Sequence, residues 1–178
     1  MKKVILKCKL KSREAFIKKL NDIDFKFSPV LWQHDRIYVP RGYKKNMNYP
    51  RLIMRTEMRD VDRPATYYFI LRRHIEDSSI DIVEETEIKD YEKIVNIILQ
   101  LGFKPIAEVS RRRETLDMGG ETYIYLDKVE NLPGYYAKIE SKLSENDTVA
   151  EAKDDLRRTF ETLGEKDFVE STYFELGA

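Results

Sequence analysis

The chain has 178 residues, with 32 lysines and arginines against 32 aspartates and glutamates, so its formal net charge is zero. This balance argues against a general attraction to nucleic acid or to a membrane surface, although it leaves room for a local basic patch. No apolar run reaches the roughly 18 residues of a transmembrane helix, no secretory signal is visible, and a single cysteine excludes an internal disulfide, so we expect one cytoplasmic domain over residues 1–178.

The first predicted element is a strand over residues 3–10, because two kinds of side chain alternate there. One face holds Val4, Leu6, Cys8 and Leu10, and the other holds Lys3, Ile5, Lys7 and Lys9. Three lysines on one face of a strand are costly unless negative groups meet them. They could face water, protein carboxylates or an anionic ligand. Cys8 belongs to the apolar face and is interpreted as a small buried hydrophobic residue.

Three amphipathic helices are predicted from their capping residues and apolar stripes. Their expected ranges are 12–22 with Ser12 as cap, 90–101 with Asp90 as cap, and 147–163, which Gly164 ends. Clusters of glycine, proline, asparagine and aspartate separate further strand-like runs. These lie at residues 28–39, 51–58, 66–73, 80–88, 105–116, 122–128 and 135–142. About eight strands and three helices predict an α+β fold.

An internal repeat is suggested when the chain is shifted by 78 positions, because strand, capped helix and strand then match without a gap. Chance is the alternative, since amphipathic helices resemble one another. The shift places Lys3 and Lys7 on Asp81 and Glu85, so one strand carries cations where its counterpart carries carboxylates. Two such halves could close an antiparallel barrel without exposed edges, and the charged faces would then point inward.

The alternation on the other strands extends this possible charged interior. Its basic members would be Lys7, Lys9, Arg55, Arg72, Arg111, Arg113 and Lys138, and its acidic members Asp81, Glu85, Glu87 and Glu140. One interpretation is a wet tunnel that accepts a polyphosphate, with carboxylates available for Mg²⁺ or Mn²⁺. The other is an internal lattice of salt bridges that needs no ligand. Strand parity does not decide between them, and one or two strands could face the other way.

Several stretches together resemble the CYTH, or triphosphate tunnel metalloenzyme, superfamily, which includes class IV adenylyl cyclases, thiamine triphosphatases and inorganic triphosphatases. They are QHDRIYVP, LIMRTEM, FILRR, EETEI, LGFKPIAEVSRRRETL, YLDKVENLPGYYAKIE and the terminal STYFEL. The resemblance implies a closed antiparallel barrel of eight strands with helices outside and a tunnel inside. It also implies a triphosphate held by basic residues and a divalent metal held by glutamates. The family's phosphate-gripping positions match Lys7, Arg55, Arg72, Arg111 and Arg113.

Departures from the family pattern concern mainly the metal ligands. The N-terminal Glu-x-Glu-x-Lys signature reads Lys3-Val4-Ile5-Leu6-Lys7, and the late Glu-x-Glu reads Lys138-Ile139-Glu140. Leu-Arg-x-Arg appears as Leu52-Ile53-Met54-Arg55. Glu85, Glu87 and Glu140 are the carboxylates left to hold a single Mg²⁺ or Mn²⁺. A two-metal mechanism is disfavoured, because each lysine in place of a glutamate moves the local charge by two units.

We therefore expect a protein that binds a triphosphate-containing ligand in a basic barrel tunnel. If it is an enzyme, it would hydrolyse a triphosphate or cyclise ATP, with Lys7 orienting or deprotonating the nucleophile. The alternative is a catalytically inactive polyanion-binding or structural protein whose lumen is closed by salt bridges. No membrane or nucleic-acid partner is indicated.

A few residues with familiar chemistry are given structural roles at this stage. His34 and His74 lack the spacing of metal ligands and are expected in surface or structural positions. Trp32 is expected in the core, although stacking at the tunnel mouth is a second possibility. Ser110 has no histidine at a spacing that supports a catalytic triad.

Overall fold

Eight strands form one closed antiparallel barrel in the computed structural model, which describes residues 1–44, 49–75, 80–144 and 146–177. The strands are β1 (Lys2–Lys9), β2 (Leu31–Pro40), β3 (Arg51–Met58), β4 (Thr66–Ile75), β5 (Ile80–Ile88), β6 (Phe103–Gly119), β7 (Thr122–Val129) and β8 (Tyr136–Lys142). Their order around the barrel is β1-β5-β4-β3-β2-β6-β7-β8. The predicted α+β fold with a closed eight-stranded barrel is confirmed.

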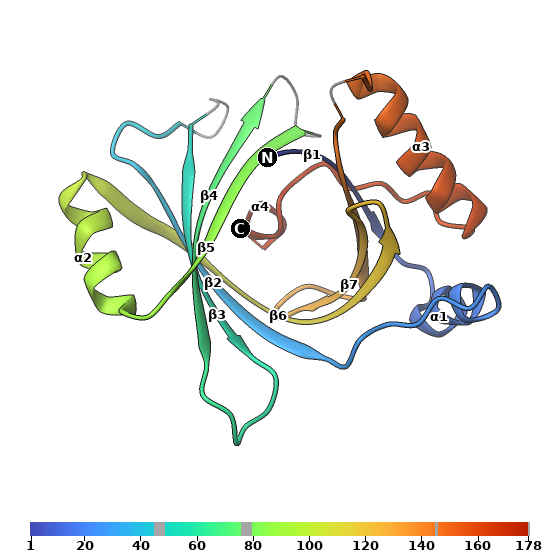
Figure 1. Ribbon diagram of the computed structural model, residues 1–178, viewed down its shortest axis with the longest axis horizontal. Helices are drawn as coiled ribbons and strands as arrows, with labels where there is room; N and C mark the ends of the chain where they lie inside the picture. The colour runs from blue at the N-terminus through green and yellow to red at the C-terminus, as the bar shows by residue number, and fades with distance from the viewer. Residues whose placement is uncertain (45–48, 76–79, 145, 178) are drawn as a thin grey trace.

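Three longer helices pack outside the barrel, as predicted. They are α1 (Arg13–Asn21), α2 (Tyr91–Gln100) and α3 (Val149–Thr162). The Ser12 hydroxyl accepts a hydrogen bond from the Ala15 amide at 3.2 Å, and the Asp90 carboxylate accepts one from the Lys93 amide at 3.0 Å. Figure 1 shows α1 and α3 on one side of the barrel and α2 on the opposite side. None of the helices in the described residues is both long and apolar enough to span a bilayer.

The order of elements is the same in the two halves of the chain. Strand, helix and three strands run from β1 to β4, and the same series runs from β5 to β8. In the barrel, β1 lies beside β5 and β2 lies beside β6. The Cα atom of Lys3 is paired with that of Asp81, the residue onto which the shift of 78 positions places it. The arrangement agrees with the predicted internal repeat.

The apolar faces of the strands are covered from outside by the helices. Val4 and Cys8 of β1 are fully buried against Phe16 and Leu20 of α1 and against Phe160 of α3. Full burial of a side chain of the size of Phe16 contributes about 1.5–3 kcal/mol. The interpretation of Cys8 as a buried hydrophobic residue is confirmed.

Tyr38, Leu52 and Met54 form a second outer cluster with Ile98 of α2. Trp32 does not belong to this core, so the prediction that it is buried is wrong. Its side chain is 52% exposed, and the guanidinium of Arg112 lies 5.5 Å from the ring centroid. The tryptophan therefore lies on the surface beside an exposed arginine from β6.

The interior of the barrel combines charged side chains with an apolar belt. Ile37, Ile53, Ile70, Val83 and Val109 form the belt, and Val169, Tyr173 and Phe174 from the end of the chain pack against it. The short helix α4 (Tyr173–Leu176) thus lies within the ring of strands, whereas the other helices lie outside it (Figure 1). The lumen is therefore partly filled by the chain's own C-terminal residues.

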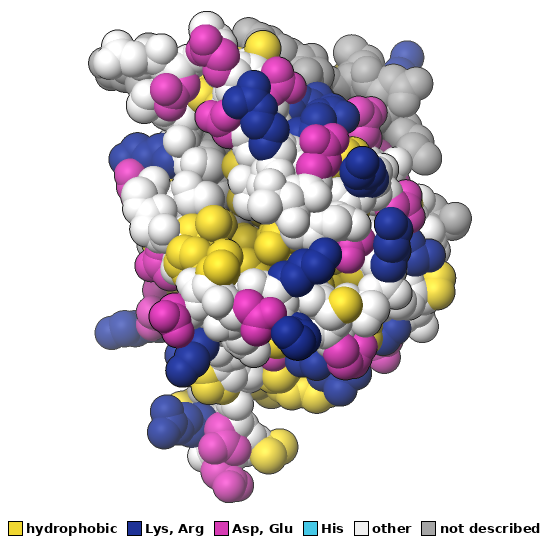
Figure 2. All heavy atoms as spheres, turned by 90° about the vertical axis from the view of Figure 1, so that its right-hand side faces the viewer, with side chains coloured by type: hydrophobic (Ala, Val, Ile, Leu, Met, Phe, Trp, Pro, Cys, Tyr) yellow, Lys and Arg dark blue, Asp and Glu magenta, His cyan; other side chains and the backbone are white. Residues whose placement is uncertain are grey.

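The outer surface mixes charges of both signs. Figure 2 shows the face that carries α1 and α3, where lysine and arginine side chains alternate with aspartate and glutamate around a small apolar patch. This face offers no extended region of a single charge. The concentration of like charge lies inside the barrel.

Candidate functional site

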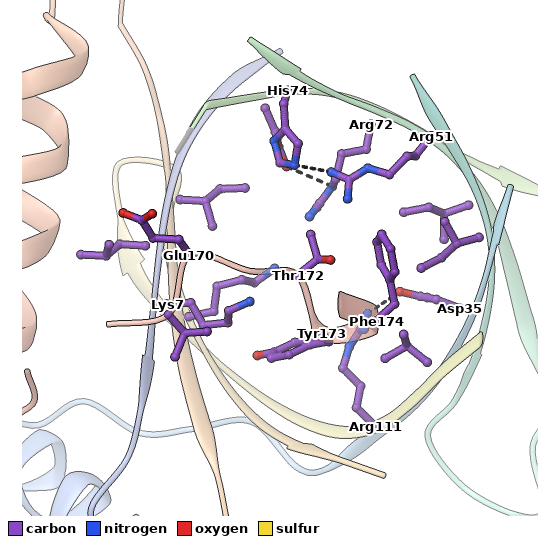
Figure 3. Close-up of a pocket in the computed structure, with 18 of the residues that line it drawn as sticks. Lys7, Asp35, Arg51, Arg72, His74, Arg111, Glu170, Thr172, Tyr173 and Phe174 are labelled. Atoms are coloured by element: carbon purple, nitrogen blue, oxygen red, sulfur yellow. Dashed lines mark hydrogen bonds and ion pairs between the residues drawn. The ribbon is translucent and has the colours of Figure 1, made fainter. Parts of the chain in front are cut away.

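A cavity of about 140 Å³ lies inside the barrel between the strands and the end of the chain (Figure 3). Its basic lining includes Lys7, Arg51, Arg55, Arg72, Arg111, Arg113 and Lys138. These are six of the seven basic residues predicted for the lumen, together with Arg51. Because they come from β1, β3, β4, β6 and β8, only closure of the barrel brings them together. We call this interior the tunnel.

Lys9 is the predicted basic residue that does not line the cavity. Its aliphatic Cε atom lies beside Gly134, 3.5 Å from the position that a Cβ atom would take on that glycine. Its backbone amide donates to the carbonyl of Asp167 at 2.9 Å. The structure therefore separates Lys9 from Lys7, although both stand on the same face of the predicted strand.

Two aspartates hold three of the tunnel arginines in fixed positions. Asp35 accepts hydrogen bonds from Arg55 at 2.7 and 3.0 Å and from Arg111 at 2.7 Å. Asp127 accepts two hydrogen bonds from Arg113, both at 2.7 Å. Burial acts to raise the pKa of Asp35, but the charges of Arg111 and Arg55 hold it well below its usual value. The same opposition, with Arg113 as the main partner, lowers the pKa of Asp127 to about 2.

A third carboxylate, Glu140, is surrounded by cations. It accepts a close hydrogen bond from Lys138, another from Lys3 at 3.3 Å, and lies 3.6 Å from Arg72. Burial opposes its charge, but Lys138 and Arg72 hold the pKa of Glu140 well below its usual value. Burial, reinforced by Arg113 and Arg72, lowers the pKa of Lys138.

Lys7 and Arg51 differ from these pairs because their contacts are with uncharged groups. The Lys7 ammonium donates to the Ser171 carbonyl and lies 4.4 Å from the centroid of the Tyr173 ring. Burial lowers the pKa of Lys7 to about 8. The Arg51 guanidinium lies 2.5 Å from His74 and 5.9 Å from the Phe174 ring centroid. Burial and the neighbouring charge of Arg72 lower the pKa of Arg51.

His74 lines the tunnel and joins this basic group to a further carboxylate. Its Nε2 atom faces Arg51 (Figure 3), and its Nδ1 atom contacts Asp81. Asp81 is 1% exposed, and its second oxygen lies 3.4 Å from Arg72 Nε. Burial acts to raise the pKa of Asp81, but the contact with His74 and the charge of Arg72 lower it. The sequence analysis gave His74 only a surface or structural role, and the tunnel position was not foreseen.

The other histidine lies outside the barrel. His34 Nδ1 is 2.8 Å from the Ser110 hydroxyl, its partner across β2 and β6, and the His34 side chain is 38% exposed. This fits the predicted surface or structural role.

Residues 167–177, here called the C-terminal segment, enter the tunnel beside β1. The Val169 amide donates to the Lys7 carbonyl at 2.9 Å, and Cys8 and Phe168 form an isolated antiparallel bridge. Further along, the Tyr173 hydroxyl donates to Asp127 at 2.8 Å. The space that remains is below the roughly 300–1,000 Å³ that is usual for small-molecule sites. The C-terminal segment therefore covers Lys7 and Arg51 and limits what can enter.

The three glutamates predicted as metal ligands do not meet at one point. Glu140 lies deep among cations, whereas Glu85 is 43% exposed and 3.8 Å from Arg55. Glu87 pairs with Tyr68 across β4 and β5 and lines a second hollow with Glu57. Across the described parts of the chain, no three histidine, cysteine, aspartate or glutamate residues are grouped so as to hold a metal ion. The donor set that the structure offers does not fit a Mg²⁺ or Mn²⁺ site.

Four tunnel residues outside the predicted set now stand out: Asp35, Arg51, His74 and Asp127. Arg51 could have been found, because it shares a strand face with Arg55 in the predicted run 51–58. Asp35 could also have been found, because alternation in QHDRIYVP places it with Gln33 and Ile37. Asp127 could have been placed in the same way, because alternation puts it on the strand face opposite Ile124 and Leu126, but its pairing with Arg113 follows only from the register of β6 with β7.

The chain was compared with known proteins. A family model described as CYTH domain matches residues 1–173. The PH1819 protein from Pyrococcus horikoshii is 25% identical, with a TM-score of 0.82, and the match covers 98% of this chain and 97% of that one. A conserved protein from Pyrococcus furiosus is 28% identical, with a TM-score of 0.76 and coverages of 98% and 99%.

A more distant structure shares the fold. HpAC1 from Hippeastrum, an adenylyl cyclase candidate described as having a dominant triphosphatase activity, is 13% identical, with a TM-score of 0.62 and coverages of 99% and 94%. A search of curated proteins gives no match to this chain.

Proposed function

The chain belongs to the CYTH domain family, and we propose that it binds a triphosphate-containing ligand in its tunnel, whether a nucleotide, an organic triphosphate or inorganic tripolyphosphate. The observation that carries the proposal is the excess of positive charge in a closed interior. The cations that line the cavity are Lys7, Arg51, Arg55, Arg72, Arg111, Arg113, Lys138, Lys153 and Arg157, and the carboxylates that line it or pair with these cations are Asp35, Asp81, Glu85, Asp127, Glu140 and Glu170. Nine cations against six carboxylates leave an excess of positive charge, which suits a polyphosphate because phosphate oxygens accept charge-assisted hydrogen bonds from lysine and arginine.

Lys7 and Arg51 are the groups that would bind phosphate first. Their present partners are a carbonyl, aromatic rings and an imidazole. Hydrogen bonds between ionised partners are roughly twice as strong as those between neutral ones, so phosphate oxygens would displace these partners. The arginines held by Asp35 and Asp127 would complete the site, since a guanidinium has donors to spare after a bidentate contact with a carboxylate.

Entry of a ligand requires movement of the C-terminal segment. Tyr173 and Phe174 occupy the space next to Lys7 and Arg51, and the remaining cavity of about 140 Å³ is too small for a nucleotide. Polar contacts hold the segment in the lumen, among them the hydrogen bonds from the Val169 amide to the Lys7 carbonyl and from Tyr173 to Asp127. We propose that phosphate binding competes with this closed arrangement.

Catalytic turnover of the bound triphosphate is the more specific part of the proposal. Lys7, whose pKa burial lowers to about 8, is in part uncharged at slightly alkaline pH and can then accept a proton from a nucleophile. Hydrolysis of the ligand or cyclisation of ATP would follow the resemblance to the family. No step is assigned to a divalent metal, because Glu85, Glu87 and Glu140 lie in different surroundings.

A structural role with a salt-bridged lumen is the second candidate, and the ion pairs themselves favour it. Asp35, Asp127 and Glu140 each neutralise at least one buried cation. Under this alternative the excess charge is tolerated and no ligand is needed.

A thermal-shift and calorimetric titration with tripolyphosphate separates the two candidates. We expect tripolyphosphate to raise the melting temperature and to bind in the presence of EDTA, because a ligand of the folded state stabilises it. Orthophosphate and sulfate should act much more weakly. The absence of heat and of any melting shift with tripolyphosphate, ATP and thiamine triphosphate, with or without Mg²⁺ or Mn²⁺, would leave the structural alternative. Release of phosphate or pyrophosphate in the same mixtures would establish turnover.

A further inference from the structure

The contact between Arg51 and His74 defines the protonation state of the histidine. Arg51 Nη2 lies 2.5 Å from His74 Nε2, and a guanidinium has only donors, so Nε2 has to accept. An imidazole that accepts at Nε2 is neutral and carries its proton on Nδ1. That nitrogen lies against the Asp81 carboxylate, although neither His74 Nδ1 nor the facing Asp81 oxygen makes a hydrogen bond in the structure. The contact with Arg51 therefore assigns one neutral tautomer to His74, whose proton lies next to a buried carboxylate oxygen that has no other hydrogen-bond partner.

This arrangement depends on Arg51 staying where it is. The other tunnel arginines, Arg55, Arg72, Arg111 and Arg113, lie at carboxylates, whereas Arg51 contacts His74 and the ring of Phe174. Arg51 therefore loses least when it turns to an anion. Because a phosphate is a far stronger acceptor for a guanidinium than an imidazole nitrogen, a bound polyphosphate would draw Arg51 away from His74.

Once Arg51 has moved, the unprotonated Nε2 of His74 faces the phosphate, so two acceptors meet with no hydrogen between them. Its opposite nitrogen still contacts a carboxylate that is 1% exposed. Uptake of one proton turns both ring nitrogens into donors, one to Asp81 and one to the phosphate.

Other charged groups around His74 come from six elements. The cations are Lys3 and Lys7 on β1, Arg51 on β3 and Arg72 on β4, and the anions are Asp81 on β5 and Glu140 on β8, with Glu175 of α4 acting on Arg51 at longer range. The group holds four cations and three anions, and a bound polyphosphate would add further negative charge beside His74, which favours the charged imidazolium.

We propose that His74 is a phosphate ligand that is switched on by proton uptake: a polyphosphate takes Arg51 from the imidazole, and the imidazole, backed by Asp81, becomes a further cation of the site. The inference rests on the proposed function, because it needs a polyphosphate in the tunnel. It assigns to the His74–Asp81 pair a role that is separate from that of Asp35 and Asp127, which hold tunnel arginines in place. Tripolyphosphate binding would then be coupled to pH through one side chain.

Nuclear magnetic resonance can observe the switch directly, because the chain has only two histidines. The variant His34→Gln removes the signals of the surface histidine and leaves His74 intact. Nitrogen-15 spectra of this variant at about pH 7.5, where an ordinary imidazole is neutral, should show the neutral tautomer with hydrogen on Nδ1. Addition of inorganic tripolyphosphate should shift both ring nitrogens to their protonated positions.

Calorimetry supplies the matched measurement. Titration of tripolyphosphate in buffers of different ionisation heat gives the number of protons taken up on binding. We expect His74→Gln to take up fewer protons than the wild type, by up to about one per ligand, and His34→Gln to match the wild type. Proton uptake by Lys7 or Lys138 is common to all three proteins and cancels in the comparison.

Each outcome has a distinct meaning. If the wild type does not bind tripolyphosphate, the proposed function fails and the switch fails with it. If tripolyphosphate binds while His74 stays neutral and His74→Gln takes up as many protons as the wild type, the switch is overturned and the proposed function stands. A doubly protonated His74 before ligand is added would overturn the assignment of the neutral tautomer.

Discussion

The substitution Tyr173→Phe tests whether the C-terminal segment competes with the ligand. It removes one hydroxyl and leaves the ring, so the contact of Lys7 with the aromatic face is kept. The lost interaction is the hydrogen bond to Asp127 at 2.8 Å. Hydrogen bonds to charged groups contribute about 1.5–3 kcal/mol, so the closed arrangement should be weakened by at least about 1.5 kcal/mol.

The expected gain in affinity follows from this value. A ligand that binds only the open state has an apparent dissociation constant inversely proportional to the open fraction, and about 1.4 kcal/mol changes that fraction about tenfold. Tripolyphosphate should therefore bind Tyr173→Phe about ten times more tightly than the wild type, as measured by isothermal titration calorimetry. The melting temperature of the ligand-free protein should fall at the same time, since the hydrogen bond also stabilises the fold.

Tyr67→Phe is the matched control, because Tyr67 packs against Tyr91 of α2 outside the tunnel. It should leave the affinity for tripolyphosphate unchanged. An affinity of Tyr173→Phe that is equal to or weaker than that of the wild type would refute the idea that the segment must move. In that case the ligand would have to enter beside Tyr173.

Four further predictions concern charge in the tunnel. Lys7→Gln should weaken tripolyphosphate binding about 10- to 100-fold in a calorimetric titration, because a charge-assisted hydrogen bond is lost. Lys9→Gln makes the same change of charge on the same strand, but it should have little effect on binding, because Lys9 does not line the cavity. Because the pKa of Lys7 is about 8, wild-type affinity should fall as the pH rises above 8, and this part of the pH dependence should disappear in Lys7→Gln. The pKa of Asp127 is lowered to about 2, so its contribution to the free energy of unfolding is present above the unfolded value near 4 and is lost as the pH falls from about 4 to 2. Urea unfolding at several pH values should therefore show a smaller loss of stability in acid for Asp127→Asn than for the wild type. An equal loss of stability in the two proteins would contradict the assignment. Tripolyphosphate should still bind in the presence of EDTA, because lysine and arginine side chains form the site. A complete loss of binding in EDTA would show that the site needs a metal ion.

Much of the barrel was predictable from local patterns. The alternation in KKVILKCKL assigns Val4 and Cys8 to one face and Lys7 to the other, and both assignments are confirmed. Ser12 and Asp90 marked the starts of α1 and α2, because a capping side chain and an apolar stripe are read within one or two turns. Six of the seven predicted basic residues line the cavity for the same reason, since parity along a strand fixes which side a residue faces.

The misplaced residues show where local patterns end. Lys9 has the parity of Lys7, but it lies where β1 leaves the cavity and the loop at Gly134 comes near. Trp32 has the size and chemistry of a core residue, but it is 52% exposed and lies beside Arg112 of β6. Both outcomes depend on how far neighbouring elements extend, which no single strand reveals.

The amino-acid sequence by itself determined the eight strands, the three longer helices, the inward direction of most of the charged side chains and the resemblance to the family. Tertiary structure alone decided which charges neutralise one another and which stay available. The pairing of Arg113 with Asp127 follows from the register of β6 with β7, and the contact of Arg51 with His74 follows from that of β3 with β4 and of β4 with β5. The physical reason is distance: side-chain periodicity acts over a few residues, whereas ion pairs and the filling of the tunnel by Tyr173 join positions that only barrel closure brings within a few ångströms.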